Sequence, residues 1–136
     1  MTTHLLLDTH VFVWLILGEP KLSRSELLHI EKASSEKNLF VSVISVWEIA
    51  MLQREGRLML TQPVRVWTED IIQTQQLEIL SLTPSIACES VDLPEFSHKD
   101  PADRIIVATA RILHMRLMTH DARIRAYAKT GHVDLA

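Results

Sequence analysis

Five acidic residues occupy positions at which their side chains can act together on one ligand. They are Asp8, Glu48, Asp100, Asp103 and Asp121. Asp8 and Asp121 each follow a short apolar segment with the composition of a buried strand, and Glu48 lies one helical turn beyond another such segment. Ligands of an open parallel sheet bind outside the carboxyl ends of its strands. The spacing therefore predicts that these carboxylates meet at one edge of a sheet.

Carboxylates placed this close raise one another's pKa unless a positive charge lies among them. A hard divalent cation supplies that charge. Carboxylate oxygens with water are typical ligands of Mg²⁺ and Mn²⁺, whereas zinc favours Cys and His. Such ions hold a phosphate group and activate a water molecule for in-line displacement. The acidic residues thus indicate metal-dependent hydrolysis of a phosphodiester bond.

Each carboxylate also has a purely structural explanation. Asp100 and Asp121 are good N-caps for the helices that follow them, and Asp103 in a first helical turn is favoured by the helix dipole. Asp8 suits a simple turn. Glu48 is the hardest to explain in this way, because the residues four before and four after it are apolar. A carboxylate on an apolar side of a helix needs a partner or an ion.

Histidines and basic residues are weaker candidates. His10, His98 and His120 lack a known ligand spacing such as His-Glu-x-x-His, and we expect them at the surface or beside the ligands. Six basic residues in the C-terminal part are candidates for phosphate contacts, although we expect at least half of them on an ordinary solvated helix surface. They are Arg104, Arg111, Arg116, Arg123, Arg125 and Lys129.

Length and composition narrow the class of protein. A chain of 136 residues with 47% apolar and 23% charged residues is predicted to form one globular domain over residues 1–136 and is not disordered by default. The single cysteine, Cys88, excludes an intramolecular disulfide and a cysteine-based zinc site, and this usage favours the cytoplasm. No apolar run approaches the roughly 20 residues that cross a membrane, so no membrane association is expected. The net charge of −3 is uneven, since residues 98–136 carry 7 Lys and Arg against 4 Asp and Glu.

Strands and helices are predicted to alternate along the chain. Strands are expected over 4–7, 38–43, 79–82, 116–119 and, as a terminal edge, 132–135. Helices are expected over 9–17, 23–35, 44–55, 63–77, 84–91, 100–114 and 121–129, with Ser23 and Glu26 forming a capping box. This alternation predicts βαβ units with right-handed crossovers, and hence an α/β fold with a mostly parallel sheet covered by helices on both faces.

Four segments carry the acidic residues in a recognisable order. They are LLLDTH at 5–10, SVISVWEI at 42–49, HKDPADRIIVATA at 98–110 and MTHD at 118–121. Together, and over nearly the whole chain, they resemble the PIN domain family. Within it they look most like the VapC-type toxins of bacterial type II toxin–antitoxin pairs. The resemblance implies a three-layer PIN-like fold with a sheet of five parallel strands in the order 3-2-1-4-5.

The same resemblance implies an Mg²⁺- or Mn²⁺-dependent endoribonuclease. By motif position, the catalytic and metal-binding quartet would be Asp8, Glu48, Asp103 and Asp121. The accessory positions would be Asp100 as a further carboxylate or cap, Thr9 and Thr119 as polar neighbours, and Arg104 as a residue that steadies the site or the substrate. By the same analogy a metal-activated water attacks phosphorus and leaves a 5′-phosphate and a 3′-hydroxyl. A homodimer, and a cognate antitoxin whose tail occludes the acidic groove, are also implied. His10 stands where many members of the family carry Asn.

Other classes of protein compete with this assignment. A receiver-type signalling domain would need an acidic pair before its phosphoacceptor and a late lysine. Residues 5–7 before Asp8 are leucines, and no lysine lies near 116–119. A phosphatase with an aspartyl nucleophile would need a second Asp two residues after Asp8, where His10 stands. A catalytically weak PIN-fold binding module is disfavoured by the presence of all four family carboxylates.

Overall fold

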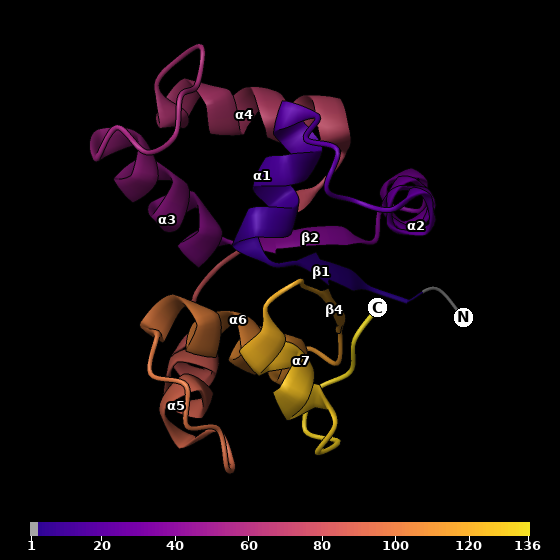
Figure 1. Cartoon of the computed structure of the whole chain (residues 1–136), viewed down its shortest axis with the longest axis vertical. Helices are drawn as coiled ribbons and strands as arrows, with labels where there is room; N and C mark the ends of the chain where they lie inside the picture. The colour runs from indigo at the N-terminus through magenta and orange to yellow at the C-terminus, as the bar shows by residue number, and fades with distance from the viewer. Residues whose placement is uncertain (1–2) are drawn as a thin grey trace.

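A parallel sheet lies at the centre of the structure, a computed structural model that describes residues 3–136 (Figure 1). Its four strands are β1 (Leu5–Leu7), β2 (Leu39–Ser42), β3 (Glu78–Leu80) and β4 (Arg116–Met118), in the order β3-β2-β1-β4. The central strand β1 pairs with both β2 and β4, and Leu6 lies opposite Phe40 and Leu117. Because every pair is parallel, all strands end at the same edge.

The prediction of a full fifth strand over 132–135 is wrong. One parallel bridge joins Leu135 to Leu117 of β4, and Leu117 N donates to the carbonyl oxygen of Asp134 at 2.9 Å. The segment runs along β4 only from Asp134 onwards, because the turn at residues 129–131 and the burial of Val133 take up the residues before it. This bridge nevertheless lies beside β4, where the order 3-2-1-4-5 puts a fifth strand.

Helices cover both faces of the sheet, which confirms the predicted three-layer α/β architecture. Within residues 3–136 they are α1 (Thr9–Leu17), α2 (Arg24–Ser35), α3 (Val43–Arg54), α4 (Val64–Gln75), α5 (Pro84–Asp92), α6 (Pro101–Ile112) and α7 (Ala122–Ala128). Each lies within two residues of its predicted bounds. In Figure 1, α1, α3 and α4 lie on one side of the strands, and α5, α6 and α7 on the other. None of the described helices has the length and apolar character needed to cross a membrane.

The two apolar faces of the sheet follow from the alternation of side chains along β1. Leu5 and Leu7 pack with Phe12 in one core cluster, whereas Leu6 packs with Ile106 in the other. All three leucines are fully buried. A strand covered on both faces needs an uninterrupted apolar run, and full burial of each leucine contributes roughly 1.5–3 kcal/mol to folding. The run of three leucines therefore fixes β1 rigidly just before the first acidic residue.

Candidate active site

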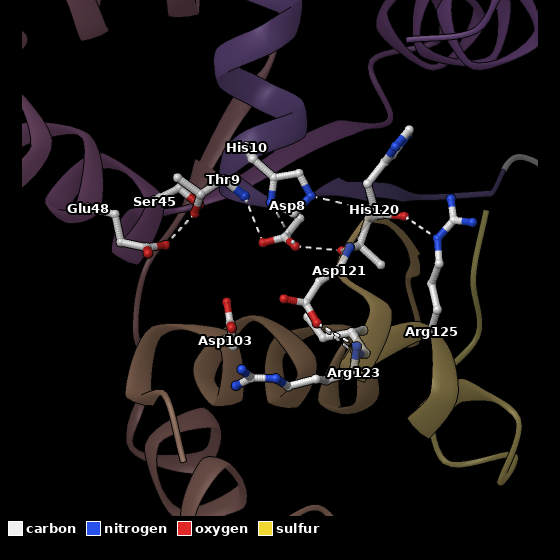
Figure 2. Close-up of polar contacts among 12 residues, drawn as sticks. Asp8, Thr9, His10, Ser45, Glu48, Asp103, His120, Asp121, Arg123 and Arg125 are labelled. Carbon is white, nitrogen blue, oxygen red and sulfur yellow. Dashed lines mark hydrogen bonds and ion pairs between the residues drawn. The ribbon is translucent and has the colours of Figure 1, made fainter. Parts of the chain in front are cut away.

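Asp8 lies at the centre of the acidic edge and is 1% exposed. Its Oδ1 accepts a hydrogen bond from the Thr9 backbone N at 2.8 Å, and its Oδ2 accepts one from the Thr119 hydroxyl at 2.6 Å (Figure 2). The Nδ1 of His10 lies 3.5 Å from the same Oδ2. A carboxylate held at both oxygens keeps one orientation, and each oxygen retains a lone pair for another ligand.

Thr119 joins Asp8 to the next acidic residue. Its hydroxyl donates to Asp8 Oδ2 and accepts a hydrogen bond from the backbone N of Asp121 at 3.0 Å. Asp121 in turn caps α7, because its Oδ1 accepts from the backbone N of Arg123 at 2.8 Å and of Ile124 at 3.0 Å. One buried hydroxyl thus sets the relative position of two carboxylates on neighbouring strand ends.

Three of the acidic residues cap helices and also lie at the site. Asp8, Asp100 and Asp121 are the N-caps of α1, α6 and α7, as the structural explanation of these residues predicts. Asp100 uses Oδ1 for the backbone N of Asp103 at 3.0 Å. Since capping occupies one oxygen each in Asp100 and Asp121, their other oxygens stay available for a ligand.

Glu48 is held by residues of α1 and α3. The Thr9 hydroxyl donates to Glu48 Oε1 at 2.5 Å and lies 2.7 Å from the Ser45 hydroxyl oxygen. Ser45 is fully buried and was not singled out from the sequence. Ser45 could have been identified from its spacing of three residues from Glu48, which places both residues on one face of a helix. These contacts point the carboxyl group of Glu48 toward the strand ends (Figure 2).

Two carboxyl groups of the site have raised pKa values. Burial raises the pKa of Glu48 to about 7, the hydrogen bond from Thr9 opposes this, and the charges of neighbouring acids reinforce it. Burial is also the main cause that raises the pKa of Asp103, against the hydrogen bond with His98 and again with the help of neighbouring acids. The acids that interact in this way are Asp8, Glu48, Asp100, Asp103 and Asp121. The structure therefore brings together all five carboxylates that the sequence predicted to meet.

His98 lies against Asp103, in agreement with the expectation that it lies at the surface or beside the ligands. Its Nε2 is 2.6 Å from Asp103 Oδ2, and its Nδ1 is 2.8 Å from Nη1 of Arg123. A guanidinium can only donate, so Nδ1 accepts and Nε2 carries the proton that it donates to Asp103. His98 thus orients Asp103 and is itself oriented by Arg123. No sequence pattern marks it, because it stands in the irregular loop before α6.

The side chain of Arg104 holds that loop in place through hydrogen bonds to backbone carbonyl groups. Its guanidinium donates to four backbone carbonyl oxygens: those of Ser90, Phe96 and His98 at 2.7, 2.8 and 2.8 Å, and that of Val91 at 3.1 Å. Four of the five N–H donors of the side chain are used in this way. This geometry favours the predicted role of steadying the site over direct contact with a substrate.

The donor set of the site fits a hard divalent cation. Ligand atoms of His98, Asp103 and Asp121 lie within 4.8 Å of one another. The proton on Nε2 of His98 leaves the carboxylate oxygens as the ready ligands. Among the residues that the structure describes, no lysine or arginine forms an ion pair with any of the quartet acids. Oxygen-rich, negatively charged sites of this kind suit Mg²⁺ or Mn²⁺.

Comparison with known proteins defines the class of this fold and site. A sequence model of the PIN domain matches residues 5–130, and the chain belongs to the PIN domain family. The ribonuclease VapC22 of Mycobacterium tuberculosis is 38% identical over 127 residues, which cover 93% of either chain. The resemblance to VapC-type PIN proteins that the motifs predicted is confirmed.

Two solved structures show the same fold at low sequence identity. One is VapBC2 from Rickettsia felis bound to a DNA fragment from its promoter, with a TM-score of 0.72, 16% identity and 98% of both chains covered. The other is a toxin–antitoxin complex from Klebsiella pneumoniae, with a TM-score of 0.55, 23% identity and 85% of both chains covered. At these identities the likeness concerns the fold alone.

Proposed function

We propose that the chain is a single-domain, divalent-metal-dependent endoribonuclease that acts in the cytoplasm as the toxin of a type II toxin–antitoxin pair. The observation that carries the proposal is the convergence of four acids from four chain segments at one sheet edge, with the pKa values of Glu48 and Asp103 raised. The 38% identity to a ribonuclease of the VapC type supports RNA as the substrate.

In this proposal Asp8, Glu48, Asp103 and Asp121 hold Mg²⁺ or Mn²⁺ and are the catalytic residues. The ion, when bound, neutralises phosphate charge and activates a water molecule for attack on phosphorus. Thr119 and Thr9 hold the oxygens of Asp8 and Glu48, so that these carboxylates need not reorganise as the substrate binds. Cleavage leaves a 5′-phosphate and a 3′-hydroxyl.

The partners follow from the same proposal. The similar structures include a VapBC assembly and a toxin–antitoxin complex, which supports a cognate antitoxin as the protein partner of this chain. A homodimer is the proposed resting assembly. An antitoxin that covers the acidic edge would keep RNA from the carboxylates.

The test is cleavage of a pool of structured RNAs by purified protein in Mg²⁺, in Mn²⁺ and in chelator. We expect discrete metal-dependent products with 5′-phosphate ends. Asp8→Asn and Asp103→Asn lower the cleavage rate by at least about 100-fold, since a metal site supplies several kcal/mol of transition-state stabilisation. Glu69→Gln is the matched control, because Glu69 is an exposed acid on α4, outside the site.

Cleavage that persists in both site variants would identify a contaminating nuclease. Absence of cleavage, in wild-type protein shown to be free of antitoxin, would favour the alternative of a PIN-fold binding module.

A further inference from the structure

A groove of about 690 Å³ opens beside the acidic edge, between the loop before α6 and one face of α7. The residues that α7 and its C-terminal turn contribute are Arg123, Ala126, Tyr127 and Thr130. Arg123, Ala126 and Tyr127 are spaced three and four residues apart, which places them on one face of α7, and Thr130 follows in the turn after the helix. One end of the groove lies at Arg123, the residue that contacts His98 of the site.

The end of the groove near the site is positively charged. Lys99 and Arg123 are exposed and line it, and within residues 3–136 neither forms an ion pair with a carboxylate. Glu95, the acidic residue of the lining, lies 3.4 Å from His132. Two exposed cations beside a cluster of acids are placed to bind a phosphate next to the one that the site cleaves.

The floor of the groove is aromatic and its rim carries hydroxyl groups. The rings of Phe96 and Tyr127 stack with centroids 4.3 Å apart and are at most 9% exposed, so a small part of each residue faces the groove. Ser97 and Thr130 are exposed at the rim. Apolar floors with a few polar groups, in volumes of roughly 300–1,000 Å³, are typical of sites for small organic groups. A nucleoside with its phosphate has this combination of surfaces.

We infer that this groove binds the RNA strand on one side of the scissile phosphate. Lys99 and Arg123 hold the neighbouring phosphate, and the floor formed by Phe96 and Tyr127 contacts the attached sugar or base. The inference rests on the proposed ribonuclease function and names the surface that this function uses. It also gives Arg123 two roles, since the same guanidinium orients His98.

The first test measures RNA affinity without cleavage. A labelled single-stranded RNA of about 12 nucleotides is titrated into Asp8→Asn protein in chelator, and fluorescence anisotropy is followed over a range of salt concentrations. Lys99→Glu and Arg123→Gln each weaken binding by roughly tenfold and reduce the slope of log K against log salt by about 0.7, the value for one phosphate of a single strand. Lys32→Glu is the control, because Lys32 is exposed on α2 and does not line the groove.

The second test fills the groove. Ala126→Trp places an indole over the floor and is expected to weaken RNA binding as strongly as Lys99→Glu, with the thermal unfolding temperature checked to show that the protein folds. In NMR spectra of the Asp8→Asn protein, RNA is expected to shift the backbone amide resonances of residues 95–99 and 123–130.

The outcomes separate this inference from the proposed function. If the wild-type protein cleaves RNA while Lys99→Glu and Ala126→Trp bind it as tightly as Lys32→Glu does, the inference about the groove is wrong and the proposed ribonuclease function is supported. If the wild-type protein neither binds nor cleaves RNA, both are wrong. If an acidic peptide shifts these amides and RNA does not, the groove belongs to a protein partner and the inference is overturned.

Discussion

The carboxyl group of Glu48 is half-buried, and its pKa lies at about 7 rather than at the ordinary 4.5. Between these two pH values the folded protein binds more protons than the unfolded chain does. The free energy of unfolding of the metal-free protein therefore falls as the pH rises through this window. Burial of the charge is the main cause, and repulsion from neighbouring acids adds to it. A bound cation would offset both and restore that stability.

Glu48→Gln keeps the shape of the side chain and removes its charge. In chelator at about pH 7.5 we expect the thermal midpoint to rise by roughly 3–5 °C, or ~1 kcal/mol after discounting for solvent screening of a partly exposed group. The dependence of the midpoint on pH between 4.5 and about 7 flattens, and stabilisation by Mn²⁺ weakens. Calorimetry with and without Mn²⁺ measures both effects, with Glu69→Gln as the control. An unchanged midpoint in Glu48→Gln would show that Glu48 carries no such repulsion.

The acidic residues were predictable because four of them follow a strand or lie in the first turn of a helix at the same sheet edge, and Glu48 lies in the helix that follows β2. The positions of Asp8 and Asp121 at this edge could be predicted from the alternation of strands and helices alone. The contacts by which His98 orients Asp103 were not predictable, since they depend on how Arg104 holds an irregular loop in place. Contacts between residues of a loop and a distant helix have no periodicity that a sequence can display.

The side chain of Arg104 joins the loop between α5 and α6 to the C-terminal end of α5. Arg104→Lys keeps the charge but loses the planar fork that reaches four carbonyl oxygens. We expect a loss of about 2–4 kcal/mol in the free energy of unfolding, measured by urea titration, because three partly buried carbonyl oxygens and one exposed carbonyl oxygen lose a charged donor. Mn²⁺ affinity, measured by titration calorimetry, falls as well, because the loop carries His98.

Arg65→Lys serves as the control for this substitution. Arg65 is exposed on α4, and we expect its replacement to change the free energy of unfolding by less than about 0.5 kcal/mol. An Arg104→Lys protein as stable as the control would show that the loop is held by its own packing.

Helices and strands were predicted closely where local patterns define them. Pro101, Ser23 and the caps at Asp100 and Asp121 mark helix starts within a residue. The predicted strand at 132–135 is reduced to one bridge, because pairing there depends on how the turn after α7 approaches β4. Such an approach is a tertiary property, which the composition of the segment does not encode.

At the scale of the whole molecule, an apolar stripe on the surface of α3 is exposed. Val43, Trp47 and Met51, spaced four residues apart, are 40%, 56% and 37% exposed. If the chain forms the proposed homodimer, light scattering at micromolar concentration gives twice its mass of 15.5 kDa. Trp47→Glu is expected to lower the mass toward that of the monomer, since exposed aromatic residues are typical anchors of such interfaces. Leu28→Glu, which replaces an exposed leucine of α2, leaves the mass unchanged. A monomeric mass for the wild-type protein would contradict the homodimer.

The pairing of β1 with β4 affects when the acidic edge can form during synthesis of the protein. The ribosome makes β1 first, yet its partner β4 and the acid behind it, Asp121, lie more than a hundred residues later. Contacts between distant segments form late, because the chain between them must be made and folded first. The nascent protein therefore carries Asp8 and Glu48 without a complete acidic edge until β4 and Asp121 have been made. In the proposed function, cleavage of RNA therefore begins only after β4 and Asp121 have been made and β4 has paired with β1, which leaves an interval between the start of synthesis and the first activity.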